Sequence, residues 1–202
     1  FTVSLNGVKL VQDLDYSVTY LSNKNVGTAK VVICGKGVYT NSLTKTFTIR
    51  PETMASAVIT GCKAKYSYTG KQVKPLIQVV WNGKILRNNT DYTLLYKNNK
   101  KRGSAGIVVT GKGNYSGTLT ASFTIVRASV KKASVTGLKA VYARTGKAVK
   151  PKVTVKLGGK KLKKKRDYIL SYRKNKKKGT ALLYVKGVGN YSGTKKMKFK
   201  IR

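Results

Sequence analysis

Acidic residues are the first place to look for chemistry, because this chain of 202 residues has only 5 of them and no His. One acid recurs: Asp15, Asp91 and Asp167 each precede a Tyr and lie 76 residues apart. A recurring carboxylate suggests a metal ligand, but hard cations need several oxygen ligands and residues 127–202 offer only Asp167. We therefore expect turn-capping Asp residues that accept backbone N–H bonds, and no metal site.

The same carboxylates raise a second possibility, a Lys–Asn isopeptide bond assisted by a buried Asp. Asp91 or Asp167, with Asn114 or Asn190, supply the residue types. Both Asn residues, however, lie in a Gly-Asn-Tyr-Ser-Gly segment, where Asn favours a left-handed turn. The turn is the favoured interpretation, and the covalent bond stays an alternative.

Catalysis is not expected, because a chain without His has no imidazole base and 5 carboxylates leave little for an acid/base pair. No cofactor is expected either. The Gly-rich segment differs from a phosphate-binding loop because a strand, not a helix, is predicted to follow it. Its tyrosine recurs as Tyr39, Tyr115 and Tyr191, and we expect a tyrosine corner in which the hydroxyl bonds nearby backbone.

The two cysteines are not equivalent by the 76-residue step and form no metal-like pair. Framework disulfides normally recur in every repeat, so Cys34 and Cys62 are expected to be free thiols. A bridge between them remains an alternative.

The elements that position these side chains repeat along the chain. Residues 51–126 and 127–202 share 35 identities in 76 positions without any insertion or deletion. The sequence therefore predicts two full repeats, 51–126 and 127–202, after a partial repeat at 1–50 that lacks about its first third. The chain begins at Phe1 without Met, so a processed or excised fragment is expected.

Within each repeat the pattern is that of β-structure. Apolar and polar residues alternate over 152–157, which is typical of a half-buried strand. Asn6-Gly7, Asn82-Gly83 and Gly158-Gly159 are dipeptides that suit two-residue hairpin turns. No segment shows helical spacing. We predict an all-β chain of small antiparallel β-sandwiches joined into a rod.

A longer pattern can be read in residues 51–126. Tyr66 to Pro75 spells Tyr-x-Tyr-Thr-Gly-Lys-x-Val-Lys-Pro, and Asp91 to Tyr96 and Gly111 to Thr118 add further motifs. This pattern resembles a bacterial immunoglobulin-like tandem repeat of Gram-positive cell-surface and secreted proteins. The resemblance implies immunoglobulin-like sandwiches, an extracellular, wall-associated location and no catalysis. It implies little about function, since such repeats serve as stalks, spacers and binding modules.

Charge is the most informative feature, with 43 Lys and Arg giving a net +38. Residues 1–50 carry +4, residues 51–126 carry +9 and residues 127–202 carry +25. Such self-repulsion destabilises a compact state, so the excess favours a polyanion partner over general solubility. The candidate polyanion-binding residues are Lys160, Lys161, Lys163, Lys164, Lys165, Arg166, Arg173, Lys174, Lys176, Lys177, Lys178, Lys196, Lys198 and Lys200.

Among polyanions, an anionic cell-wall polymer is the first expectation and an acidic glycan the second. Nucleic acid is expected to bind only non-specifically, because Lys greatly outnumbers Arg and the Tyr residues alternate into the core. No apolar run is long enough to cross a membrane.

Three functions remain open from the sequence. The favoured one is a non-catalytic surface stalk or adhesin segment anchored through its basic C-terminal repeat. A second is a module that binds a host ligand, namely a glycan, a matrix protein or an immunoglobulin; Trp81 is expected in the core rather than in such a site. A third is a filament subunit, because the partial first repeat leaves an open sheet edge.

Overall fold

The computed structural model describes all residues, Phe1–Arg202, and confirms the predicted all-β class. Its one helical element is a single turn of 3-10 helix, η1 (Val130–Lys132). None of its helical structure has the length and apolar character needed to cross a membrane. The chain divides into two discontinuous compact units. The first unit is Phe1–Thr60, Gln78–Leu95 and Val108–Thr120, and the second is Gly61–Ile77, Tyr96–Ile107 and Ala121–Arg202.

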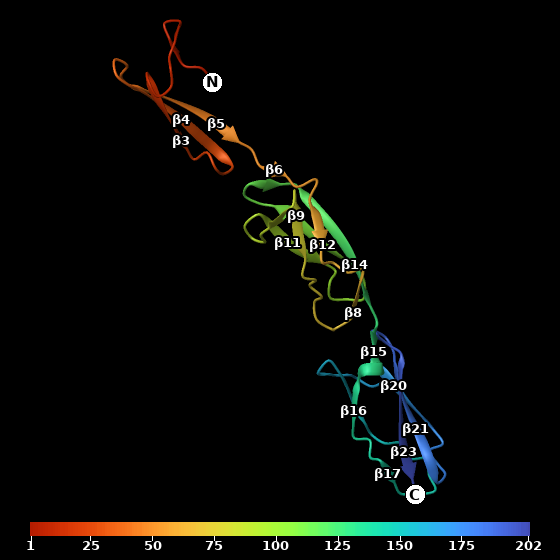
Figure 1. The fold of residues 1–202 in the computed structure, drawn as a ribbon. Coiled ribbons are helices and arrows are strands. Elements are labelled where there is room, and N and C mark those ends of the chain that lie inside the picture. The colour runs from red at the N-terminus through yellow and green to blue at the C-terminus, as the bar shows by residue number, and fades with distance from the viewer. The chain divides into compact units, whose positions relative to one another are not determined.

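Residues 1–50 form two small antiparallel sheets (Figure 1). One is a hairpin of β1 and β2, and the other has the order β3-β4-β5, so that β3 and β5 are its edges. The bounds are β1 (Ser4–Leu5), β2 (Val8–Lys9), β3 (Tyr16–Leu21), β4 (Gly27–Gly35) and β5 (Ser42–Ile49).

Residues 51–126 contribute nine strands. They are arranged as a sheet of order β10-β9-β7, a sheet of order β11-β12-β14-β8 and the pair β13-β6. The bounds are β6 (Glu52–Thr53), β7 (Val58–Thr60), β8 (Lys65–Ser67), β9 (Gln78–Trp81), β10 (Lys84–Leu86), β11 (Tyr92–Lys97), β12 (Gly103–Gly111), β13 (Tyr115–Ser116) and β14 (Thr118–Val126).

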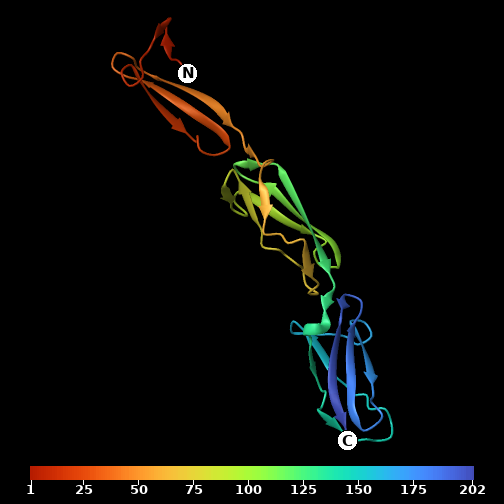
Figure 2. The same ribbon diagram turned by 45° about the vertical axis from the view of Figure 1, so that its right-hand side comes forward.

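Residues 127–202 lie in the second unit and repeat this arrangement. A sheet of order β16-β18-β19 and a sheet of order β17-β23-β21-β20 accompany the pair β15-β22. The long blue strands of the larger sheet lie side by side in Figure 2. The bounds are β15 (Ala128–Ser129), β16 (Ser134–Thr136), β17 (Val141–Tyr142), β18 (Thr154–Leu157), β19 (Lys160–Lys161), β20 (Tyr168–Arg173), β21 (Gly179–Gly187), β22 (Tyr191–Ser192) and β23 (Thr194–Ile201).

Alternate burial along the long strands matches the sequence prediction. In β23, Phe199 and Ile201 are buried against Val155 and Leu183, while every second residue is exposed. The two-residue turns also have the expected left-handed backbone, with φ of 46° at Asn82. These features follow from the period of two and from turn residues that tolerate positive φ.

Strand direction differs in part from the prediction of antiparallel strands throughout. The long strands are antiparallel, but short strands join their edges in parallel: β8 beside β14, β17 beside β23, β6 beside β13 and β15 beside β22. Parallel neighbours require a crossover connection, so distant segments meet here. A local residue pattern does not reveal such pairings.

The predicted tyrosine corner is wrong in its partners. The Tyr115 hydroxyl accepts a hydrogen bond from Lys84 Nζ at 2.9 Å, and the Tyr191 ring packs edge-on against Tyr68. Other tyrosines bond to backbone instead. The Tyr66 hydroxyl accepts from the Lys63 N–H at 2.8 Å, as Tyr142 does from Lys139 at 2.8 Å, and the Tyr172 hydroxyl donates to the Pro151 carbonyl at 2.7 Å. The Gly-Asn-Tyr-Ser-Gly tyrosines are core residues, because their rings are buried.

Equivalent phenylalanines in β5 and β23 differ sharply in burial, with Phe47 40% exposed and Phe199 2% exposed. We expect Phe199→Ala to lower the free energy of unfolding by about 3–5 kcal/mol. Phe47→Ala should cost only about 1–2 kcal/mol, because water already reaches the ring. Native-state hydrogen exchange of the β21 and β4 amides measures the two losses separately. Equal losses would contradict this account of the two sheets.

Candidate polyanion-binding surface

The three recurring Asp residues cap turns, as predicted. The backbone N–H of Val11 donates to Asp15 Oδ2 at 2.7 Å, and the backbone N–H of Lys163 donates to Asp167 Oδ2 at 2.8 Å. Arg87 N–H donates in the same way to Asp91 at 2.8 Å. Each carboxylate therefore closes the turn that leads into a Tyr-initiated strand.

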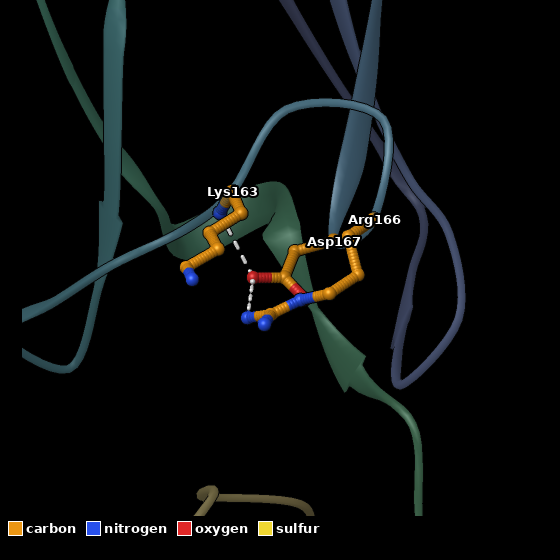
Figure 3. Close-up of polar contacts among 3 residues, drawn as sticks. All are labelled: Lys163, Arg166 and Asp167. Carbon is orange, nitrogen blue, oxygen red and sulfur yellow. Dashed lines mark hydrogen bonds and ion pairs between the residues drawn. The ribbon is translucent and has the colours of Figure 1, made fainter.

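Asp167 has an additional partner in Arg166, shown in Figure 3. The guanidinium donates from Nε to Oδ1 at 3.0 Å and from a terminal nitrogen to Oδ2 at 2.9 Å. These hydrogen bonds hold the pKa of Asp167 below its ordinary value despite burial, and they raise the pKa of Arg166. Asp167 is the only acid of residues 127–202, and it is already paired. The other basic residues of this repeat have no acidic side chain to balance them.

The first group of candidate residues lies in β19 and the turn that follows it. Lys160, Lys161, Lys163, Lys164 and Lys165 are all exposed, while Leu162 between them is buried in the core. The turn therefore keeps one apolar anchor and directs its lysines to solvent.

The second group lies at the opposite end of β20. Arg173, Lys174, Lys176, Lys177 and Lys178 are exposed around the loop that leads into β21. Strand β20 spans six residues, so about 17–20 Å of strand separates this loop from the first group. The structure does not gather the two groups into one cluster.

The third group joins these two ends. Lys196, Lys198 and Lys200 are exposed on one face of β23, at alternate positions about 7 Å apart. Lys198 lies opposite Leu182 of β21, and Leu182 lies opposite Arg173 of β20, so one row crosses the sheet. The Arg173 guanidinium stacks 5.7 Å from the centroid of the Tyr184 ring on the same face. We call this surface, formed by the outward residues of β20, β21 and β23, the basic face.

A cleft of about 850 Å³ opens in the same unit, on the side of β20 opposite to the basic face. Tyr168, Leu170 and Tyr172 line its apolar side, and burial raises the pKa of both Tyr hydroxyls. Its basic lining consists of Lys150, Lys152, Lys161, Lys163 and Lys164.

Sequence reasoning missed two of these lysines, Lys150 and Lys152. They flank Pro151, and Lys152 begins the alternating stretch 152–157, for which the sequence predicts a strand but no binding role. That alternation was the available signal. It did not show that the segment would face β19 and β20.

The two cysteines and the single tryptophan lie in structural surroundings. Cys34 and Cys62 are free and half-buried, and burial raises the pKa of the Cys62 thiol. Trp81 packs edge-on against Tyr115 and donates its indole N–H to the Thr53 carbonyl at 3.0 Å. No group of three or more potential metal-ligating residues is present.

Asn114, considered above for an isopeptide bond, has both ends of its amide engaged. Its side-chain oxygen accepts from the Val26 N–H at 2.8 Å, and its nitrogen donates to Asn25 at 2.9 Å. A strand, β13, follows this turn directly, as the sequence predicted. The Gly-Asn-Tyr-Ser-Gly turn is therefore joined through Asn114 to the loop of Asn25 and Val26 in the first unit.

Comparison with known proteins adds no family to this description: no protein-family model and no curated protein matches the sequence. The basic face and the cleft present ammonium and guanidinium groups, which donate hydrogen bonds and attract anions.

Two of these lysines have a backbone conformation that lowers the stability of the fold. Lys165 and Lys174 adopt left-handed φ of 70° and 54°, where the equivalent Asn89 and Asn98 have 68° and 54°. Asn tolerates this conformation because its short polar side chain bonds locally, whereas most other residues pay about 1–2 kcal/mol. Lysine therefore stands at two positions that its backbone disfavours.

We expect Lys165→Asn and Lys174→Asn each to stabilise the second unit by about 0.5–1 kcal/mol. Lys164→Asn is the matched control for Lys165→Asn, because it removes the same charge from the same turn without a left-handed residue. Urea denaturation at about 0.15 M and about 1 M salt separates the two effects, since salt screens charge and leaves backbone strain unchanged. A gain from Lys164→Asn as large as the others at high salt would contradict the strain argument.

The lowered pKa of Asp167 has a definite consequence for acid stability. Its ionised form stabilises the fold at pH values above the ordinary Asp pKa, and this contribution is lost as the pH falls through the folded pKa. We expect Asp167→Asn to be about 1–3 kcal/mol less stable than the parent at about pH 5. The difference should shrink towards about pH 2. Urea denaturation across this pH range measures it, and a constant difference would show that ionisation of Asp167 is not responsible.

Proposed function

We propose that the chain is a non-catalytic segment of a bacterial surface protein, a stalk or adhesin that associates with an anionic cell-wall polymer through residues 127–202. Its location is extracellular, on the cell surface or in the wall. The chain consists of immunoglobulin-like sandwiches in tandem, 1–50, 51–126 and 127–202, that form a rod. The strand order of its sheets and the 76-residue step support this architecture.

One observation carries the polymer-binding proposal: the outward positions of β23 are lysines where the other repeats have hydroxyl residues. The inward residues of the same strand are kept, since Phe199 and Ile201 match Phe123 and Ile125. The repeats therefore differ in charge at these outward positions while their inward residues are the same. The equivalents of Lys196, Lys198 and Lys200 are Thr120, Ser122 and Thr124 in residues 51–126, and Thr44, Thr46 and Thr48 in residues 1–50.

The arrangement suits a long flexible polymer better than a compact ligand. The basic groups are spread over a sheet face and two loops at opposite ends of β20, so a chain of phosphates or carboxylates can contact many of them at once. The association depends on salt, because it replaces the counterions of the polymer with fixed protein charges.

The cleft favours a second candidate function, the binding of an acidic glycan. Its lining combines the apolar rings and side chain of Tyr168, Leu170 and Tyr172 with five lysines. An acidic sugar can place its ring against the apolar side and its charge against the lysines. This alternative uses different residues from the basic face, so variants can distinguish the two.

We expect 1–202 to bind poly(glycerol phosphate) with a steep salt dependence. A triple variant, Lys196→Thr, Lys198→Ser and Lys200→Thr, should weaken binding at least tenfold at low salt. It should also reduce the slope of log affinity against log salt by about two to three. Isothermal titration calorimetry over a salt series measures both quantities. The substituted residues are those of 51–126, so the strand should tolerate them.

The matched control removes three other exposed lysines of residues 127–202 in favour of their equivalents: Lys131→Ala, Lys132→Ser and Lys156→Val. It should bind within about twofold of the parent if the basic face is the site. Equal losses in both triple variants would show that only total charge matters. No binding by the parent would overturn the proposal. Binding of hyaluronan that is lost in Lys152→Leu with Lys161→Ile would instead assign the cleft to an acidic glycan.

A further inference from the structure

One outward residue of the basic face is aromatic. Tyr184 lies on β21 between the buried residues Leu183 and Val185, so its ring lies on the outer side of the sheet. It is half-buried, and it departs from the expectation that the tyrosines alternate into the core. The Arg173 guanidinium of β20 lies over this ring, 5.7 Å from its centroid. Because the face of an aromatic ring attracts a guanidinium, Tyr184 holds this cation in place.

The Arg173 guanidinium has no acidic partner. Asp167 is the only acid of residues 127–202, and it pairs with Arg166. Figure 3 shows how a guanidinium of this chain engages an oxyanion, with two nitrogens of Arg166 donating to the two oxygens of Asp167 at 3.0 and 2.9 Å. Arg173 has the same planar fork of donors, which matches a group with two acceptor oxygens.

Two exposed lysines of β23 lie beside the Arg173–Tyr184 pair. Lys196 is opposite Tyr184 in the ladder between β21 and β23, and Lys198 is opposite Leu182. Leu182 is in turn opposite Arg173 of β20. Neighbouring strands are about 4.8 Å apart, so an anion bound to Arg173 is close to both ammonium groups.

These four positions differ together from their equivalents in the preceding repeat. Residues 51–126 have Lys97, Val108, Thr120 and Ser122 where this group has Arg173, Tyr184, Lys196 and Lys198. A need for charge explains the two lysines of β23 but not the other two residues, because Lys97 is already a cation and Tyr184 is neutral. Arg beside Tyr, in place of Lys beside Val, is the combination that a stacked and bidentate anion site requires.

The lysines of β23 set an interval for further anions. Alternate residues of a strand are about 7 Å apart, so Lys196, Lys198 and Lys200 follow one another at that interval. Phosphates joined through three-carbon units are separated by six skeletal bonds, which also span about 7 Å in an extended chain. A polymer with one phosphate between Arg173 and Lys198 therefore places its neighbouring phosphates beside Lys196 and Lys200.

We propose, on the basis of the wall-polymer association above, that Arg173 is the anchoring site for one phosphodiester of a polyol phosphate polymer with three-carbon units. The Arg173 fork donates to the two non-bridging oxygens of that phosphodiester, and Lys198 contacts the same group. Tyr184 is a positioning residue, because it orients the guanidinium and need not touch the polymer. Lys196 and Lys200 receive the phosphates on either side.

The test is titration of the full chain with poly(glycerol phosphate) at about 0.15 M salt, followed by calorimetry. Arg173→Lys and Tyr184→Val each introduce the equivalent residue of 51–126 and leave the net charge unchanged. Each should weaken binding at least threefold without changing the slope of log affinity against log salt. Because Tyr184 acts through Arg173, the double variant should bind no more weakly than Arg173→Lys alone. Tyr184→Phe keeps the ring and should bind within about twofold of the parent.

Two comparisons serve as controls. Arg127→Lys makes the same chemical change at an exposed Arg outside the basic face and should change binding less than about twofold. Poly(ribitol phosphate), whose five-carbon units place the phosphates further apart, should bind at least threefold more weakly per phosphate.

Each part of the proposal can be contradicted separately. Binding by the parent that is unchanged in Arg173→Lys and Tyr184→Val would overturn the anchoring site and leave the wall-polymer association standing. Additive losses in the double variant would overturn the positioning role of Tyr184. Equal binding of the two polyol phosphates would overturn the three-carbon interval, and tighter, Arg173-dependent binding of polygalacturonate would reassign the site to carboxylates. No binding by the parent would overturn the proposed function itself, and the anchoring site with it.

Discussion

Alternate burial along the long strands is the constraint on which the rest of the structure depends. Inward positions must stay apolar, because Val155, Leu183 and Phe199 fill the space between two sheets. Outward positions carry no such requirement, so they alone are free to change. The concentration of lysine in residues 127–202 uses this freedom fully. The strand that carries Phe199 and Ile201 inward carries three lysines outward without a change in register.

The few acids fit the same division between structure and surface. Asp167 closes a turn and binds Arg166, and both interactions involve residues within four positions of it. The other cations of this repeat therefore have no acidic partner within residues 127–202. Repulsion among them is partly relieved by solvent screening and, on our proposal, by an anionic polymer. The presence of Lys165 and Lys174 at left-handed positions indicates that charge is retained even where it strains the backbone.

Local patterns predicted most of the fold and only part of the site. Alternation identified β23, dipeptides identified the hairpin turns, and the Asp-Tyr pairs identified the caps, because each signal involves neighbours in sequence. Contacts between distant segments were missed. Nothing near Tyr66 indicates a parallel partner in β14, and nothing near Lys152 indicates that it lines a cleft with Lys161. The predicted hydrogen-bond partner of the Tyr115 hydroxyl was wrong for the same reason, since its actual donor, Lys84, is distant in sequence.

The exposed basic loops have a consequence for the lifetime of the molecule. A loop with several accessible lysines is a preferred site of cleavage by proteases that cut after basic residues. Residues 163–166 and 174–178 both meet this description, and they precede the neighbouring strands β20 and β21. A polymer lying across the basic face would shield them. Survival in a protease-rich environment would then depend on occupancy, so that molecules released from their partner are degraded first.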